Sequence, residues 1–309
     1  MNSGNRMGDR AFMRYLSPMG AWALAFGCSV GWGAFVMPGT TFLPVAGPLG
    51  TVLGIIIGGL IMLVIGNNYF HLMNRYPESG GTYAYAKYCF GYDHGFLNGW
   101  FLLLTYVAII WANATALPLI ARHLFGGLFQ FGFHYQIAGF DIYMGEVLLA
   151  EVSLVIAALL CLRGRVAAKA QTVMALLLGA GIVVGIVAAI VNPGSMLRSA
   201  APAFSPKQSP VAGTLTIIAL APWAYVGFES ISHSAAEFDF PVRKSFRVLV
   251  IALITAAGAY ALLALLAVSA LPEGCAGWTD YIFNLGEYEG VRGLPTFSAA
   301  ECEMDSKPT

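Results

Sequence analysis

The sequence between residues 25 and 39 reads AFGCSVGWGAFVMPG. It lies in an apolar run long enough to cross a membrane, for which a helix needs about 20 residues. Gly27, Gly31 and Gly33, followed by Pro38 and Gly39, weaken this helix, by about 1 kcal/mol per Gly and about 3 kcal/mol for Pro. In lipid, a break survives only where protein or a polar cavity satisfies the exposed backbone groups. We therefore expect the segment around Gly31–Gly33 to be unwound for a function; close packing of helices through small residues is the alternative.

A second apolar stretch is interrupted in the same way. Residues 218–230 read IALAPWAYVGFES, with Pro222 and Gly227 near the middle of a predicted span and the carboxylate of Glu229 at membrane depth. An ionisable side chain there indicates function by default, and a Glu hydrogen-bonded to neighbouring helices is the structural alternative. His233 follows one turn later on the same helical face, so it could belong to a proton path with Glu229.

The composition indicates a membrane protein. The 309 residues are 58% apolar and 10% charged, with a mean hydropathy of +0.72, whereas soluble domains carry about 25% charged residues. The net charge is zero, and no basic cluster predicts a nucleic-acid partner; membrane lipids are the partner that this composition requires. The sequence also lacks the spaced His, Cys and acidic residues of a metal or catalytic site, so we expect no cofactor and no enzymatic activity.

We predict seven membrane spans and an all-α, polytopic fold. A bias in Lys and Arg then orients the chain with its N-terminus in the cytoplasm, because positive residues are retained on that side. One side holds Arg6, Arg10, Arg14, Arg75, Lys87, Arg163, Arg165, Lys169, Arg243, Lys244 and Arg247, and the other holds Arg122, Arg198, Lys207, Arg292 and Lys307. The predicted spans cover residues 16–44, 48–73, 94–122, 142–162, 170–191, 213–236 and 246–271.

The two interrupted spans are the first and the sixth, which makes them antiparallel. That spacing is what an inverted repeat of five helices requires, with the substrate site at the breaks. Exposed amides at one break could hold a carboxylate and free carbonyls at the other an ammonium, so the pair suits a zwitterion such as an amino acid. The predicted organisation is a cytoplasmic tail (1–15), a first repeat (16–191), an extracytoplasmic loop (192–212), two helices of a second repeat (213–271) and an acidic extracytoplasmic tail (272–309).

Several motifs resemble the amino acid–polyamine–organocation (APC) permeases. The segment Gly31–Phe35 followed by Pro38 resembles the broken first helix of that family. Pro77-Glu78-Ser79-Gly80-Gly81-Thr82-Tyr83 and the glycines up to Trp100 resemble its loop between helices two and three. The stretch from Gly227 to Pro241 resembles its sixth helix. The resemblance runs from about residue 15 to 271, and the loop from Pro77 to Trp100 is its most specific part.

The resemblance implies secondary transport of an amino acid or a related amine by alternating access at the inner membrane, with the coupling ion, proton or sodium, left open. It implies that Trp223 lies where the family's arginine/agmatine antiporter stacks an aromatic ring on the substrate, which suits a cation–π contact; a packing role in the membrane is the alternative. Glu229 would then bias the pocket towards cations or carry a proton. The implied carboxylate site is the backbone of Val30, Gly31, Trp32, Gly33 and Ala34, and the implied ammonium site is formed by carbonyls around Trp223, Ala224, Tyr225, Val226 and Gly227.

The sequence departs from the family in three respects. Trp32 replaces the usual small Ser, which predicts a narrower pocket or a gate, and Leu178 stands where many members have a Lys. Family members have about twelve spans, so we expect the second repeat to be incomplete after the seventh. A permease-derived amino-acid receptor and a non-functional permease fragment are therefore alternatives to a transporter. In the tail, Cys275 and Cys302 could form a disulfide if that tail is extracytoplasmic.

Overall fold

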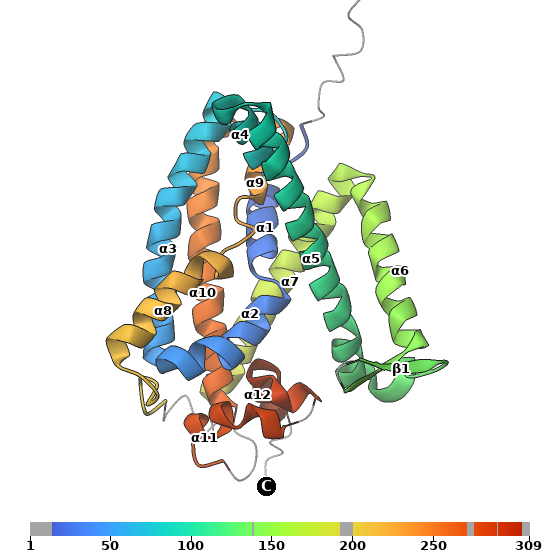
Figure 1. Ribbon diagram of the computed structural model, residues 1–309, viewed down its shortest axis with the longest axis vertical. Helices are drawn as coiled ribbons and strands as arrows, with labels where there is room; N and C mark the ends of the chain where they lie inside the picture. Colours follow the sequence, from blue (N-terminus) through green and yellow to red (C-terminus); the bar gives the residue numbers. More distant parts are fainter. Residues whose placement is uncertain (1–13, 138, 192–199, 271–274, 289, 305–309) are drawn as a thin grey trace, which may run out of the picture.

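The computed structural model describes residues 14–137, 139–191, 200–270, 275–288 and 290–304. The chain forms a bundle of long helices whose axes run along the long dimension of the molecule (Figure 1). Helix α1 lies against α7 and α10, and α3 packs along α8 and α10. The principal helices are α1 (Pro18–Ser29), α3 (Leu43–Arg75), α5 (Tyr92–Phe125), α6 (Met144–Cys161), α7 (Gly164–Val191), α8 (Pro210–Ala224) and α10 (Ser245–Ser269).

Five helical stretches of the described chain are long and apolar enough to cross a membrane. The first and sixth predicted spans instead consist of shorter pieces, because both are broken: α1 has 12 residues and α8 has 15. An all-α membrane fold is therefore confirmed. The two spans that were predicted to be interrupted, the first and the sixth, are indeed broken. The five stretches are Trp32–Arg75, Tyr92–Phe129, Met144–Cys161, Gly164–Val191 and Val242–Ser269.

The first two predicted spans are joined without a loop. Helix α2 (Trp32–Met37) continues through a π-helical turn, Pro38–Phe42, directly into α3. Pro38 does not end the helix here: it stands at the first position of the π turn, and the helical backbone continues on both sides of it. The predicted boundary at residues 45–47 is confirmed, because the chain kinks at Gly47, whose backbone angles are non-helical.

Small residues bring α3 and α8 into close contact. A Cβ on Gly54 would lie 2.5 Å from the Cβ of Ile217, and one on Gly58 would collide with Ala221. Such close approach of two helices through small residues is how membrane helices associate. On α7, a Cβ on Gly185 would touch Leu266 of α10 at 3.4 Å, whereas a Cβ on Gly181 would meet nothing within 4 Å among the described residues.

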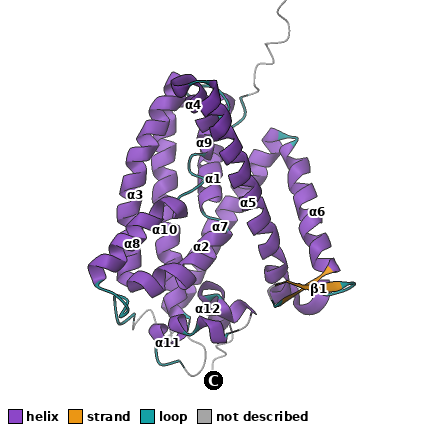
Figure 2. Ribbon diagram, in the orientation of Figure 1, coloured by secondary structure: helices purple, strands orange, loops and turns teal. Residues whose placement is uncertain are grey.

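A short β-hairpin joins α5 to α6 at the end of the bundle opposite α4 (Thr82–Phe90) (Figures 1 and 2). Strands β1 (His134–Ile137) and β2 (Phe140–Tyr143) pair antiparallel and were not predicted. The remaining short helical turns are Gly126–Phe129, Ala235–Glu237, Val242–Lys244, Leu285–Glu287 and Gly290–Gly293.

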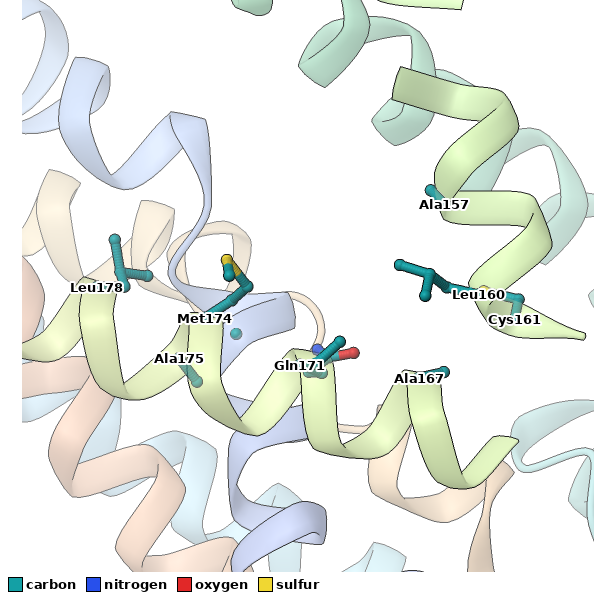
Figure 3. Close-up of a pocket in the computed structure, with 10 residues that line it drawn as sticks. Ala157, Leu160, Cys161, Ala167, Gln171, Met174, Ala175 and Leu178 are labelled. Atoms are coloured by element: carbon teal, nitrogen blue, oxygen red, sulfur yellow. The ribbon is translucent and has the colours of Figure 1, made fainter. Parts of the chain in front are cut away.

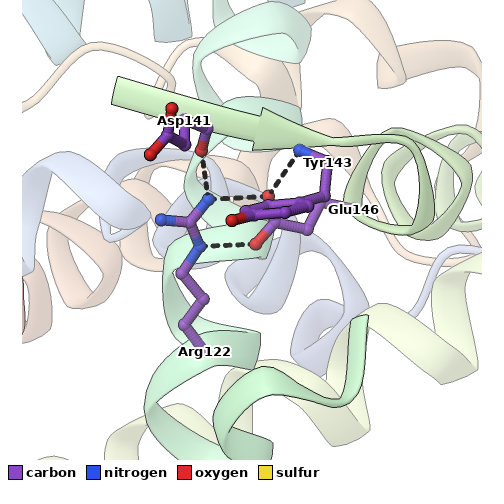
Figure 4. Close-up of polar contacts among 4 residues, drawn as sticks. All are labelled: Arg122, Asp141, Tyr143 and Glu146. Atoms are coloured by element: carbon purple, nitrogen blue, oxygen red, sulfur yellow. Dashed lines mark hydrogen bonds and ion pairs between the residues drawn. The ribbon is translucent and has the colours of Figure 1, made fainter. Parts of the chain in front are cut away.

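An ion pair fixes α5 to the start of α6 beneath this hairpin (Figure 4). Arg122 forms a bidentate contact with Glu146, one arm being Nη2 to Oε2 at 2.7 Å. Glu146 Oε2 also accepts a hydrogen bond from the Tyr143 amide at 3.1 Å, which caps α6. Glu146 is 1% exposed, and a buried carboxylate needs such partners. The carboxylate that interrupts the fourth predicted span thus stabilises the fold.

The C-terminal segment folds onto the end of the bundle that carries the hairpin (Figure 1). Its helices α11 (Trp278–Phe283) and α12 (Pro295–Met304) pack against α3 and α10, respectively. The rings of Trp278 and Tyr281 are fully buried and belong to the same hydrophobic core as the long helices, so this part of the predicted acidic tail is packed into the bundle. The sulfur of Cys275 is a free thiol 3.1 Å from the Tyr288 hydroxyl, and the side chain of Cys302 lies outside the described residues.

Candidate functional site

The first break lies between α1 and α2, at the predicted glycines. Helix α1 ends at Ser29, and Val30 and Gly31 have non-helical backbone angles. The Ala34 amide donates to the Gly31 carbonyl at 3.0 Å. The amides of Gly31, Trp32 and Gly33 find no acceptor within the described part of the chain, as expected where a helix begins. These donors make the break a place where an anionic group could be held.

The second break separates α8 from α9 (Ser230–His233). Gly227 has a φ of +108°, a conformation that residues with a side chain rarely adopt. The Glu229 carboxylate accepts a hydrogen bond from the Gly227 amide at 2.8 Å. Glu229 therefore stabilises the turn of its own break, a contact that the sequence did not predict.

The two breaks touch one another. A Cβ on Gly227 would lie 2.6 Å from the carbonyl carbon and oxygen of Cys28, so only Gly allows this approach. The hydroxyl of Ser29 lies 3.3 Å from the Tyr225 carbonyl oxygen, and the Tyr260 hydroxyl donates to the Ser29 carbonyl at 3.3 Å. Unwound backbone from both halves of the chain thus meets in the middle of the bundle.

The expected substrate carbonyls of the second break are only partly available. The Trp223 carbonyl accepts a hydrogen bond from the Val226 amide, and the Tyr225 carbonyl accepts one from the Phe228 amide, both at 3.2 Å. The Val226 carbonyl has no donor among the described residues. A carbonyl has two lone pairs, but the Trp223 carbonyl also faces the Tyr225 amide and the Tyr225 carbonyl also faces the Ser29 hydroxyl. Neither carbonyl therefore keeps an acceptor site without a neighbouring donor.

The side chains of the predicted residues fall into two groups. Val30, Ala34, Ala224 and Tyr225 are buried, and the Tyr225 hydroxyl donates to the Ile55 carbonyl of α3 at 2.9 Å. Trp223 is 61% exposed and has no ring or cation partner in the described chain. The buried group supports the shape of the breaks, whereas the Trp223 ring lies on the surface of the described chain.

Residues distant in sequence complete the surroundings of the first break. The amide oxygen of Asn113, on α5, is 3.9 Å from the position of a Cβ on Gly31. The ring of Phe297, on α12, lies 5.4 Å from that of Trp32 and 5.7 Å from that of Phe35. Sequence reasoning missed Asn113 and Phe297, because no local pattern marks a side chain that reaches a site from another helix.

Glu229 and His233 are engaged separately. His233 Nε2 lies 3.0 Å from the Tyr106 hydroxyl of α5, and its carbonyl accepts from the Gly80 amide at 3.4 Å. A Cβ on Gly81 would lie 2.6 Å from His233 Nδ1 and 2.8 Å from Ser232 Oγ. The double glycine of the loop motif therefore lets that loop pack directly on α9. No hydrogen bond joins Glu229 to His233 within the described residues.

A cavity of about 330 Å³ adjoins the first break between α1, α6 and α7 (Figure 3). Gly27, one turn before the break, lines it together with Gln171 and Met174. A Cβ on Gly27 would lie 3.2 Å from Gln171 Nε2, so the glycine allows the amide of Gln171 to reach α1. The cavity is mainly apolar, and Gln171 supplies a polar group within it.

Comparisons with known proteins agree with this arrangement. The family model described as "Amino acid permease" matches residues 16–276. The chain is 26% identical to the vacuolar cationic amino acid transporter 2 of Arabidopsis thaliana over 273 residues, which cover 81% of this chain and 40% of that protein. It is 28% identical to the L-methionine/branched-chain amino acid exporter YjeH of Escherichia coli over 194 residues, 62% of this chain and 42% of that protein.

A shorter match, 32% identical over 119 residues, relates the chain to the methylthioribose transporter of Bacillus subtilis; it covers 38% of this chain and 26% of that protein. The chain thus spans less than half the length of each of these relatives. The family match also confirms the expectation that the chain is not an enzyme. On the evidence of the family model, the broken helices and the loop packing, the chain belongs to the amino acid permease family of the APC superfamily.

Proposed function

We propose that this protein takes part in secondary transport of an amino acid or a related amine across the cell membrane by alternating access. The observation that carries the proposal is the contact between the two breaks at Cys28 and Gly227. Broken helices from the two halves of an inverted repeat form substrate sites near the middle of a membrane. The names of the relatives, which include cationic amino acid transporters and an amino acid exporter, support the same class of substrate.

In this proposal the two breaks divide the recognition of a zwitterion between them. The free amides of Gly31, Trp32 and Gly33 hold the substrate carboxylate, since the start of a helix favours an anion. The Val226 carbonyl and the exposed face of Trp223 receive the ammonium group. Glu229 adds negative charge at the second break. His233, on α9, lies beyond that break and contacts the Tyr106 hydroxyl of α5. The coupling ion, proton or sodium, is left open.

The orientation is part of the proposal. We infer that the N-terminus lies in the cytoplasm and the β-hairpin outside the cell membrane, because Lys and Arg concentrate in the segments on the N-terminal side. The α6–α7 turn, for instance, carries Arg163, and the first turns of α7 carry Arg165 and Lys169.

Gly31 offers a test of binding that leaves packing intact. A Cβ there would have only the Asn113 oxygen nearby, at 3.9 Å, so Gly31→Leu should cover the free amides without disturbing the core. We expect it to weaken amino-acid binding at least tenfold, measured by ligand-induced thermal stabilisation of the purified protein, with the unfolding midpoint unchanged. Gly179→Leu is the control, because Gly179 on α7 has nothing within 4 Å. Binding retained in Gly31→Leu would mean that these glycines do not form the site.

Flux is tested with the protein reconstituted in proteoliposomes. Counterflow of a labelled amino acid or amine would support transport, and Gly31→Leu should abolish it. Binding without any flux would favour the receptor alternative, and the absence of both would favour the fragment alternative.

Glu229→Gln separates charge from shape at the second break. The Gln side chain keeps an oxygen that can accept the Gly227 amide, so the turn should persist while the negative charge is lost. We expect preference for cationic over neutral substrates to fall about tenfold, the factor that corresponds to 1.4 kcal/mol. Glu78→Gln is the matched control, because Glu78 is exposed and bonded to Tyr88. An unchanged preference and an unchanged pH profile would leave Glu229 with a structural role alone.

A further inference from the structure

The entry of the chain into α1 is tied to the segment that follows α9. The amides of Tyr15 and Leu16 both donate to the Glu237 carbonyl, at 2.9 and 3.0 Å, and the Asp239 amide donates to the Leu16 carbonyl at 3.1 Å. Leu16 and Phe238 are both buried. These bonds join the start of α1 to the segment that follows α9, at the ends of both helices that lie away from the breaks.

A side-chain bond reinforces the backbone contacts. The Tyr15 hydroxyl donates to Glu237 Oε2 at 2.7 Å. Burial and this bond to Glu237 raise the pKa of Tyr15 to about 12, so the hydroxyl keeps its proton at neutral pH. A Cβ on Gly164, at the start of α7, would lie 2.5 Å from the Tyr15 oxygen. Tyr15 therefore touches three elements: the entry to α1, the segment after α9 and the first turn of α7.

The Tyr15–Glu237 contact lies beside two adjoining cavities, at the end of the bundle that carries the entry to α1. Tyr15, Gly164 and Glu237 line a cavity of about 290 Å³. That cavity shares Ala167 and Gln171 of α7 with the cavity of about 330 Å³ that reaches Gly27 beside the first break (Figure 3). The two cavities therefore adjoin at α7, and the Tyr15–Glu237 pair lines the one farther from the break.

We propose that Tyr15 and Glu237 form a latch that holds this end of the transport path closed and releases when the path opens. The inference rests on the proposed function, because only a transporter must open this end in turn. A hydrogen bond to a carboxylate is stronger than a neutral one and still weak enough to break reversibly. Because the latch joins the outer ends of α1 and α9, movement of either broken helix on substrate binding would strain it.

A reporter cysteine inside the path tests the latch. Ala170 lines the inner cavity and not the outer one, so Ala170→Cys is introduced into the protein with its native cysteines replaced by serine. A membrane-impermeant methanethiosulfonate is then added on the side of the N-terminus, and the rate of modification is measured. We expect Tyr15→Phe and Glu237→Ala each to raise this rate about tenfold, as for loss of a charge-assisted hydrogen bond. The double variant should be no faster than either single variant.

Two further variants complete the test. Tyr88→Phe is the control, because it removes a Tyr–carboxylate bond of 2.9 Å to Glu78 that lies outside both cavities. Gly164→Ala should speed modification by a different route, since its Cβ displaces Tyr15, and it serves if Tyr15→Phe does not fold. An unchanged rate in both latch variants, or effects that simply add in the double variant, would overturn the latch. Amino-acid binding is measured in parallel: its absence from the protein without latch substitutions would count against the proposed function, whereas the labelling rates test the latch separately.

Discussion

Single residues decide how closely the two breaks approach. Gly227 combines a positive φ with a contact against the Cys28 backbone, so its lack of a side chain serves conformation and packing together. Glu229 adds a local bond to the same turn. The second break is therefore a defined structure, held by one glycine and one carboxylate.

We predict that Gly227→Ala weakens this site more than it weakens the fold. The added Cβ would be strained in its backbone and would push α9 away from α1, at a cost of about 1–3 kcal/mol. Amino-acid binding measured by thermal stabilisation should fall at least tenfold. Gly258→Ala on α10 is the control, because a Cβ there meets nothing within 4 Å. Equal binding by the two variants would show that the approach of the breaks does not matter for the site.

At the scale of elements, helices are joined by a few specific contacts rather than by hydrophobicity. Lipid is as apolar as the helices, so packing through small residues and polar bonds must supply the association. The contact of Gly54 and Gly58 with α8 is of the first kind. The bidentate contact of Arg122 with Glu146 is of the second kind, and it also anchors the hairpin through a bond to the Asp141 carbonyl (Figure 4).

We predict that Arg122→Ala destabilises the α5–α6 pair. Removal of one partner leaves the buried Glu146 carboxylate without its ion pair, which costs about 3 kcal/mol. The midpoint of thermal unfolding in detergent should fall by several degrees, and protease should cut the hairpin faster. Arg163→Ala, in the α6–α7 turn, removes the same charge where no ion pair is formed among the described residues and should leave both readouts unchanged. A drop of equal size in Arg163→Ala would point to a general effect of charge.

At the scale of the whole molecule, the bundle has two different ends. One end carries α4 and the entry to α1, and the other carries the β-hairpin with α11 and α12 (Figure 1). Lys and Arg concentrate toward the first end, while α11 and α12 cover the second end and bring Phe297 against Trp32. The two ends therefore differ in charge and in the segments that cover them.

We predict opposite membrane exposure for these ends. A cysteine at Arg165 should react with an impermeant thiol reagent only from the cytoplasmic side, and one at Gln136 in the hairpin only from the outside, because positive residues are retained in the cytoplasm. The measurement compares intact cells with inverted vesicles, using the protein without native cysteines. Reaction of both positions from one side would contradict the topology.

The positions of the breaks could be predicted from the sequence, whereas their surroundings could not. Gly31 and Gly227 lie at the breaks and act through their own backbone, so the cost of helix at these positions can be predicted from the local sequence. Gly33 and Pro222, by contrast, lie within α2 and α8. The apolar length of the spans can likewise be predicted from the local sequence. The resemblance singled out the loop that begins at Pro77. The structure gives the reason for its double glycine, because Gly81 packs directly against His233.

What only the tertiary structure decided are the contacts between distant segments. Asn113 beside Gly31, Phe297 beside Trp32 and the Tyr15–Glu237 bond depend on how helices cross, and no short pattern encodes a crossing. The Glu146 carboxylate likewise needed its partner Arg122, 24 residues away, before its role was clear. The sequence by itself determined where the backbone of this permease must unwind, because that cost is local; the tertiary structure decided what meets the unwound backbone, because that requires two segments at once.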